Sequence, residues 1–304
     1  MVILDVIEKW KEYKRQFIKE SSYYSYCFLI KNYILPFFGE EIEFTESKLQ
    51  EFVLEKIKFG LSVKTIKDCV VVIKMIQKYG AKQGYWNLVP FDLIYPTDQR
   101  KKELDIMSKD NQRKLMKYLK NNFSFYNLGL IICLSTGIRI GEICALKWCD
   151  FDRGNNTLRI QRTIQRLQVL DNDKTYTRLV ISTPKTSNSQ REIPLSNELV
   201  KMIKPLLRVV NCEYFVLSNA LTPIEPRRYR KYYKKILNEL EIPDLKFHGL
   251  RHSFATRCIE SKSDYKTLSV LLGHSNITTT LNLYVHPNNE EKKKCIEKML
   301  KNLM

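Results

Sequence analysis

Apolar residues recur at helical spacing through about the first 95 positions of the chain. Thr45 and Ser62 stand where the N-terminal caps of two such segments are expected, because a hydroxyl there can accept a hydrogen bond from the first helical turn. We therefore predict a small helical bundle, with helices over residues 21–33, 48–59 and 63–79.

The composition changes after this bundle. Pro90 and Pro96 are followed by a charged stretch over residues 98–103, which is typical of an exposed connection between domains. We predict a helical domain over 1–96, a linker over 97–106 and a second domain over 107–304 that ends in a helix at about 289–304.

The second domain mixes two periodicities. Ser108 precedes a helical pattern that runs to Leu119, and a further helix is indicated around the apolar run at 128–134. Alternating residues at 157–169, 175–183 and 191–195 predict a three-stranded antiparallel sheet, after which the helical spacing returns at Asn197. The expected fold class is mainly α with a small antiparallel β-sheet (α+β).

Charge narrows the range of partners. The chain has 51 Lys and Arg against 33 Asp and Glu, a formal net charge of +18. This favours a polyanion, most commonly nucleic acid, although an anionic membrane surface also fits. No apolar run approaches the ~20 residues needed to span a bilayer, and the N-terminus lacks a signal-peptide layout, so we expect a cytoplasmic protein, in a bacterial cytosol or nucleoid.

All four histidines fall within 39 residues of one another, which suggests a site. His248, Arg251 and His252 are expected on the side of a helix opposite the apolar positions 250, 254 and 258, where cationic donors near a helix N-terminus suit a phosphate. His252 and His286 are interpreted as ordinary core or capping residues. A zinc site through His248 and His252 is disfavoured because no acid lies between them and no third ligand is evident, so no metal is expected.

Two further segments change this interpretation. They read Thr-Gly-Ile-Arg-Ile-Gly-Glu-Ile-Cys-Ala-Leu over 136–146 and Leu-Leu-Gly-His over 271–274, with Tyr284 ten residues after His274. Together with His-Gly-Leu-Arg-His over 248–252, they resemble the tyrosine recombinase, or phage integrase, family. The N-terminal bundle looks like the core-binding, DNA-binding domain of that family, and the rest resembles its mixed α/β catalytic domain.

The resemblance implies a role for each residue that matches a motif. Arg139 and Arg251 would clamp the scissile phosphate, for which guanidinium groups are well suited because they stay charged and bind phosphate oxygens in pairs. Glu142 would orient this cationic cluster. Tyr284 would be the nucleophile that forms a 3′-phosphotyrosyl bond, with His248 accepting its proton and His274 donating to the phosphate.

The resemblance also implies a general acid. Lys185, at the head of a turn before Arg191, matches the lysine that protonates the departing 5′ oxygen in the family. Because the phosphodiester energy is kept in the tyrosyl link, neither ATP nor another cofactor is expected.

The end of the chain suggests self-association. Ile296, Met299, Leu300 and Leu303 form an apolar stripe on a charged helix. The helix could pack on its own domain, but the resemblance implies docking on a neighbouring protomer, in a tetramer that joins two double-stranded DNA sites. No arm-binding domain is expected before the bundle, and in this respect the chain resembles Xer-type or mobile-element recombinases. Accessory DNA-bending or directionality proteins could take part in the reaction.

Three other functions remain open on the sequence. A type IB topoisomerase would use the same chemistry but reseal the original strand. A DNA-binding regulator would need no catalysis, yet every residue that matches a catalytic position is present. A membrane-surface protein would need a basic amphipathic helix with exposed aromatic residues, which we do not find. Neither the DNA target sequence nor the choice among integration, excision, inversion and dimer resolution can be deduced.

Overall fold

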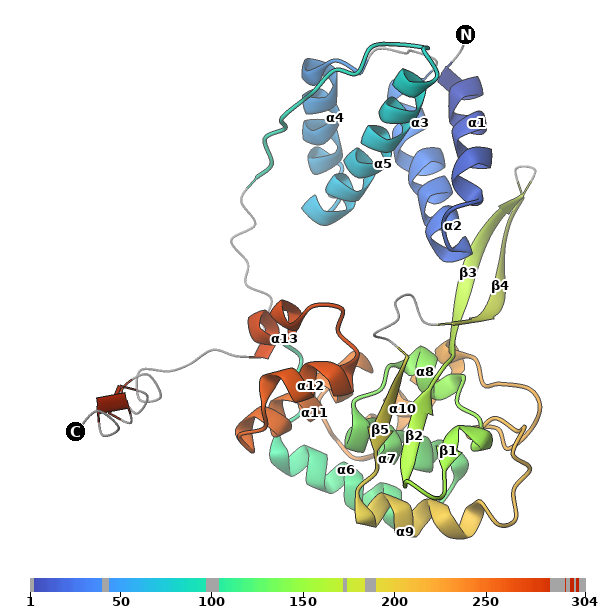
Figure 1. Cartoon of the computed structure of the whole chain (residues 1–304), viewed down its shortest axis with the longest axis vertical. Coiled ribbons are helices and arrows are strands. Elements are labelled where there is room, and N and C mark those ends of the chain that lie inside the picture. Colours follow the sequence, from blue (N-terminus) through green and yellow to red (C-terminus); the bar gives the residue numbers. More distant parts are fainter. Residues whose placement is uncertain are drawn as a thin grey trace. The chain divides into compact units, whose positions relative to one another are not determined.

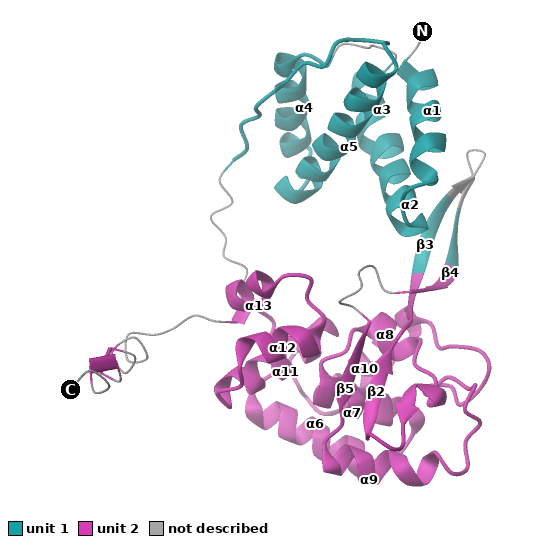
Figure 2. Cartoon of the chain, viewed as in Figure 1, with its two compact units in different colours: residues 1–102, 166–178 teal, residues 103–165, 179–304 magenta. Residues whose placement is uncertain are grey.

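The computed structural model describes residues 3–39, 44–96, 104–171, 174–183 and 190–284, with 293, 296–297 and 299–300 near the C-terminus. The chain forms two compact units, which are coloured separately in Figure 2. Unit 1 contains residues 1–102 and 166–178, and unit 2 contains 103–165 and 179–304. The predicted domain bounds remain a prediction, and the grouping of 166–178 with the N-terminal helices was not expected.

Unit 1 is a helical bundle (Figure 1). Thr45 and Ser62 cap α4 and α5 as predicted, each accepting a hydrogen bond from the backbone three residues later. The core is built mainly of large apolar side chains from these helices, among them Phe52 and Ile73. The helices are α1 (Ile3–Arg15), α2 (Glu20–Leu29), a π-helical turn (Ile30–Ile34), α3 (Leu35–Phe38), α4 (Glu46–Lys58) and α5 (Val63–Lys82).

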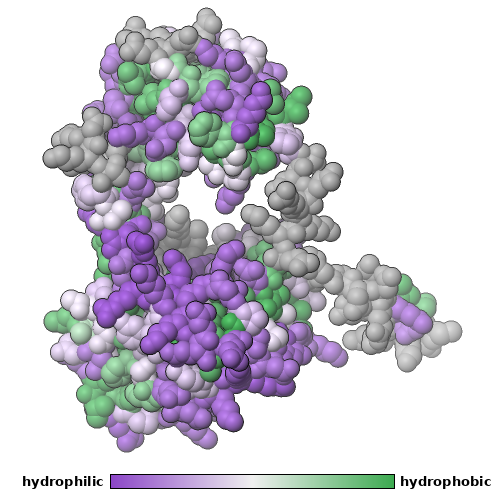
Figure 3. Space-filling model, turned by 180° about the vertical axis from the view of Figure 1, so that it is seen from behind, coloured by the Kyte–Doolittle hydropathy of each residue, from purple (hydrophilic) through white to green (hydrophobic). Residues whose placement is uncertain are grey.

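Unit 2 is mainly helical with a small sheet. Its largest core cluster surrounds α7, whose residues are buried on nearly every side, as its continuous apolar sequence requires. Ser108 caps α6 as predicted. Hydrophilic side chains cover much of the face of unit 2 seen in Figure 3. The helices are α6 (Lys109–Asn121), α7 (Phe125–Thr136), α8 (Ile140–Cys144), a 3₁₀ turn (Trp148–Asp150), α9 (Asn197–Leu206), α10 (Pro226–Glu239), α11 (His248–Glu260), α12 (Tyr265–Leu272) and α13 (Ile277–Tyr284).

The predicted three-stranded sheet is wrong in its composition. The three-stranded sheet has the order β1-β2-β5, from β1 (Phe151–Asp152), β2 (Thr157–Ile160) and β5 (Arg191–Pro194), all antiparallel. The segment predicted as one strand over 157–169 divides into β2 and β3 (Thr163–Asp171), and β3 pairs with β4 (Lys174–Ser182) in a separate two-stranded hairpin. Alternation identified the strands but not their partners.

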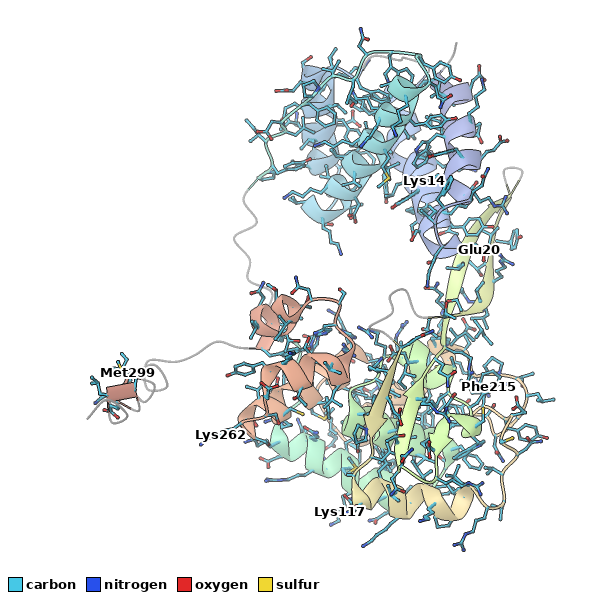
Figure 4. The ribbon with its side chains drawn as sticks, in the orientation of Figure 1. Lys14, Glu20, Lys117, Phe215, Lys262 and Met299 are labelled. Carbon is cyan, nitrogen blue, oxygen red and sulfur yellow. The ribbon has the colours of Figure 1, made fainter. Side chains whose placement is uncertain are left out.

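The outer part of this hairpin belongs to unit 1. There Arg178 of β4 forms an ion pair with Glu20, the first residue of α2, which is labelled in Figure 4. Arg166 of β3 also donates a hydrogen bond to Thr177 across the hairpin. No helix within the described ranges is both long and apolar enough to cross a bilayer.

Candidate functional site

The C-terminal end of α12 binds three arginine side chains. Gly273 ends this helix in the left-handed region, at φ 65°, and so leaves carbonyl groups at the helix terminus facing away from the helix. Arg191 donates to the carbonyl of Leu271 at 2.6 Å, Arg251 to that of Leu272 at 2.7 Å and Arg139 to that of Gly273 at 3.3 Å. The negative end of the helix dipole therefore supports a cluster of positive charge.

Glu142 holds two of these arginines from one buried carboxylate. It accepts hydrogen bonds from the Arg139 side chain and backbone, both at 2.8 Å, and from the Arg191 side chain at 2.9 and 3.1 Å. Burial raises the pKa of Glu142, but the hydrogen bonds and charge of Arg191, together with Arg139, outweigh this and hold the pKa below its ordinary value. Glu142 thus stays ionised and orients the cluster.

Arg251 is one of the most buried charged residues described, with 2% of its surface exposed. Arg251 was expected on the side of α11 opposite its apolar positions, and in the structure it is more buried than the apolar Phe254 and Cys258. Its guanidinium also donates to the carbonyl of Gly137 at 3.0 Å. Burial and the charge of Arg139 lower the pKa of Arg251 to about 9, so it remains charged at neutral pH.

Tyr284 lies at the end of α13, beside α11 and α12 in Figure 1. Its hydroxyl is 2.6 Å from Nδ1 of His252, the histidine that sequence analysis interpreted as a core or capping residue. His248, the expected proton acceptor, meets His252 edge to face with ring centroids 4.6 Å apart. Burial raises the pKa of Tyr284, while the charges of Arg251 and Arg139 oppose this effect.

The histidines of the site are held neutral. Burial lowers the pKa of His248 to about 4, with the charges of His252 and Arg251 adding to the effect. Burial and the charges of Arg251 and Arg139 likewise lower the pKa of His274 to about 4. The ring of His274 is oriented by a 2.7 Å contact between Nδ1 and the hydroxyl of the buried Thr280.

A pocket of about 550 Å³ opens beside the arginines. Arg139, His248 and Arg251 form part of its lining. Further cations line it as well, namely Arg230, Lys234 and Lys246. This arrangement is suited to an extended anion with several charges, such as a nucleic acid strand.

Several predicted residues lie outside the described ranges. Lys185 and His286 are among them, as is most of the predicted terminal helix at 289–304. The described stripe residues Ile296, Met299 and Leu300 are exposed in the single chain. Within the described ranges, no group of three or more His, Cys, Asp and Glu residues is arranged to hold a metal ion.

Two residues of this cluster were not predicted from the sequence. Arg191 was noted only as a neighbour of the turn, although its side chain is 3% exposed and contacts Glu142. His252 was noted but not given a role at Tyr284. For His252 a signal existed, because it lies four residues after His248 and therefore on the same helix face. For Arg191 the contacts come from distant segments, and local pattern carries no such signal.

The chain matches known protein families and individual relatives in sequence. Residues 105–291 match the family described as "Phage integrase family", and residues 3–55 match "Phage integrase, N-terminal SAM-like domain". The tyrosine recombinase XerC-like protein of Caldanaerobacter subterraneus is 29% identical over 96% of this chain and 81% of that protein. The ICEBs1 integrase of Bacillus subtilis is 20% identical over 92% of this chain and 78% of that protein.

Solved structures share the fold. The Tn1549 transposon integrase in complex with a circular intermediate DNA has a TM-score of 0.74 at 20% identity, covering 98% of this chain and 99% of that one. The lambda integrase tetramer bound to a Holliday junction has a TM-score of 0.64 at 14% identity, covering 95% of this chain and 80% of that one.

Proposed function

Since the chain belongs to the phage integrase family and is a site-specific tyrosine recombinase acting on DNA, we propose that Tyr284 is its nucleophile. Arg139 and Arg251 bind the phosphate that Tyr284 attacks. The observation that carries this assignment is the arginine cluster at the end of α12, where the charges of both arginines also act on Tyr284. Such preorganised donors stabilise the extra negative charge on phosphorus in the transition state.

The reaction proceeds by two balanced transfers. The Tyr284 oxygen attacks the scissile phosphorus, the bond from phosphorus to the 5′ oxygen breaks, and the DNA is left joined to the protein through a 3′-phosphotyrosyl bond. A 5′ hydroxyl of the partner duplex then attacks the same phosphorus and releases Tyr284. Bond energy is conserved in both steps, so this chemistry requires neither ATP nor a metal ion.

Histidines accept and donate protons around this phosphate. His252 is the group in contact with the Tyr284 hydroxyl in the free protein, and its neutral ring can accept the phenolic proton. His248 lies next to His252 and lines the pocket, where it acts on the phosphate or relays the proton. His274 contacts the phosphate through Nε2, since Nδ1 is bound to Thr280. Lys185 protonates the departing 5′ oxygen.

Assembly on DNA completes the proposal. The substrate is double-stranded DNA with two recombination sites, and four protomers join them through the C-terminal helix at 289–304. The protein integrates, excises or inverts a DNA element in the bacterial cytosol or nucleoid. A net charge of +18 supports binding to the duplex. Docking on a neighbouring protomer would also cover the exposed apolar side chains of Ile296, Met299 and Leu300.

A covalent adduct tests the nucleophile. The full chain is incubated, without metal or ATP, with nicked suicide duplexes from its own genomic neighbourhood, and denaturing gels are used to detect protein bound to DNA. The wild type should form an adduct that Tyr284→Phe abolishes. Tyr233→Phe is the matched control, since the buried Tyr233 hydroxyl finds no hydrogen-bond partner among the described residues, and it should still form the adduct. Strong DNA binding without any adduct would indicate a non-catalytic binder.

A further inference from the structure

Arg191 is a buried cation that the reaction described above does not use. It is the first residue of β5, where it pairs in register with Ile160 of β2. Its guanidinium is 3% exposed, and it donates to both oxygens of Glu142 and to the carbonyl of Leu271. A group so enclosed cannot reach a DNA phosphate. Any part that it plays in catalysis must therefore pass through its neighbours.

The first of those neighbours is Glu142, whose two oxygens are each shared. One oxygen accepts from the side chains of Arg139 and Arg191, and the other accepts from the Arg139 backbone and the Arg191 side chain. Arg191 therefore binds both oxygens of the carboxylate that also binds Arg139. Without it the carboxylate would be free to rotate toward Arg139 and change the direction of that guanidinium.

The second neighbour is the end of α12. Leu271, Leu272 and Gly273 are consecutive, and their carbonyls accept from Arg191, Arg251 and Arg139 respectively. A shift of this helix end would move the acceptors of both phosphate-binding arginines together. The bond between Arg191 and Leu271 joins this helix end to β5, and through β5 to the three-stranded sheet.

From these contacts we propose that Arg191 is a positioning residue for DNA cleavage, which holds Glu142 and the end of α12 so that Arg139 and Arg251 face the scissile phosphate. The inference rests on the proposed function, because it assigns Arg191 a part in presenting those two arginines. Misplacement of a reacting group by about 1 Å can cost on the order of 100-fold in rate, so a small shift is enough to be measured.

Single-turnover cleavage of the suicide duplex tests this role. Arg191→Lys keeps the charge but cannot make the paired bonds to Glu142 and the bond to Leu271 at the same time. We expect it to cut about 10-fold or more slowly than the wild type, with the dissociation constant for the same duplex unchanged within about twofold because Arg191 does not face the DNA. Arg191→Met should be slower still.

Two further measurements separate positioning from general damage. Arg162→Met removes another arginine that is paired with a buried acid, but that acid is Asp150 and not Glu142, so this variant should cleave at the wild-type rate. In the background of Glu142→Gln, Arg191→Met should slow cleavage less than it does in the wild type, because the two residues act through one contact. Circular dichroism and thermal melting establish that each variant is folded.

Several results would overturn the inference. It fails if Arg191→Lys is folded and cuts at the wild-type rate, if DNA binding falls in parallel with cleavage, or if the effects of Arg191→Met and Glu142→Gln simply multiply. A wild type that forms an adduct independent of Tyr284, or none at all, overturns the proposed function and the inference with it. A normal Tyr284 adduct with an unaffected Arg191→Lys overturns the inference alone.

Discussion

Charge at the level of single residues explains why the free site is ready for an anion. Arg139, Arg191 and Arg251 lie close together, and Glu142 is the acid that ion-pairs with Arg139 and Arg191. Removing one partner of a buried ion pair costs on the order of 3–5 kcal/mol, so Glu142 and Arg191 depend on each other. Burial, and after it the charge of Arg139, lowers the pKa of Arg251, and a bound phosphate would offset the repulsion between the two arginines.

The same charges make the stability of the protein depend on pH. His248 and His274 have pKa values of about 4 when folded, below the ordinary 6.5. Between these values the unfolded chain binds protons that the folded chain does not, so stability is full above about pH 6.5 and falls as the pH drops toward 4. Melting temperatures from pH 7.5 to 4.5 should show this loss.

Substitution of the two histidines separates their contribution to the pH dependence of stability from that of other titratable groups. The double change His248→Asn and His274→Asn should reduce the loss of melting temperature between pH 6.5 and 4.5. A short DNA duplex should also reduce it in the wild type, because a bound phosphate favours protonated histidine. An unchanged pH profile in the double variant would show that these histidines are not held neutral by the fold.

At the scale of elements, two helix ends build the site. Gly137 and Gly273 end α7 and α12 with left-handed backbone, and the carbonyl groups there accept from Arg251 and Arg139. The sequences Thr-Gly and Leu-Gly-His thus mark places where a helix stops and its free carbonyls meet a cation. This gives the glycines of the motifs a structural reason.

Gly137→Ala tests this arrangement. The added Cβ would lie 2.5 Å from Cδ1 of Phe254, in addition to the strain of its left-handed backbone. We expect a loss of about 2–3 kcal/mol in the free energy of unfolding, from strain and overpacking together, and slower cleavage because the carbonyl of Gly137 binds Arg251. Urea unfolding and the adduct assay measure the two effects.

Gly60→Ala is the matched control. Gly60 is also left-handed, at φ 82°, but a Cβ there meets nothing within 4 Å. It should lose only about 1 kcal/mol, from backbone strain, and cleave normally. Equal losses in the two variants would mean that the contact with Phe254 does not matter.

At the scale of the whole molecule, cleavage of one DNA site and strand exchange between two duplexes should be separable. The arginine cluster and Tyr284 lie within unit 2 of a single chain, whereas the exchange proposed above between two duplexes would involve several protomers. The residues that would connect the protomers are the exposed apolar side chains near the C-terminus, of which Met299 is labelled in Figure 4.

A chain that ends at residue 288 tests this separation. It should still form the Tyr284 adduct on a single site, but lose assembly on DNA in light scattering and fall at least about 10-fold in strand exchange, because we propose that residues 289–304 dock on a neighbouring protomer. Replacing Ile296 and Met299 with Glu in the full chain should act in the same way. Packing of the helix on its own chain would instead lower the melting temperature and single-site cleavage together.

By itself, the sequence determined the helical bundle, its caps at Thr45, Ser62 and Ser108, the family, and the candidate residues Arg139, Arg251, His274 and Tyr284. These features depend on local periodicity, capping hydroxyls or short motifs, all of which can be read along the chain.

Only the tertiary structure decided which strands pair, which histidine meets Tyr284 and where Arg191 lies. Alternation specifies that a segment is extended but not its partner, and β3 and β4 pair with each other, as strands separated by only two residues along the chain commonly do. The contact of Arg191 with Glu142 joins residues 49 positions apart, and that with Leu271 joins residues 80 apart. Such contacts arise from packing between elements, on which local patterns carry no information.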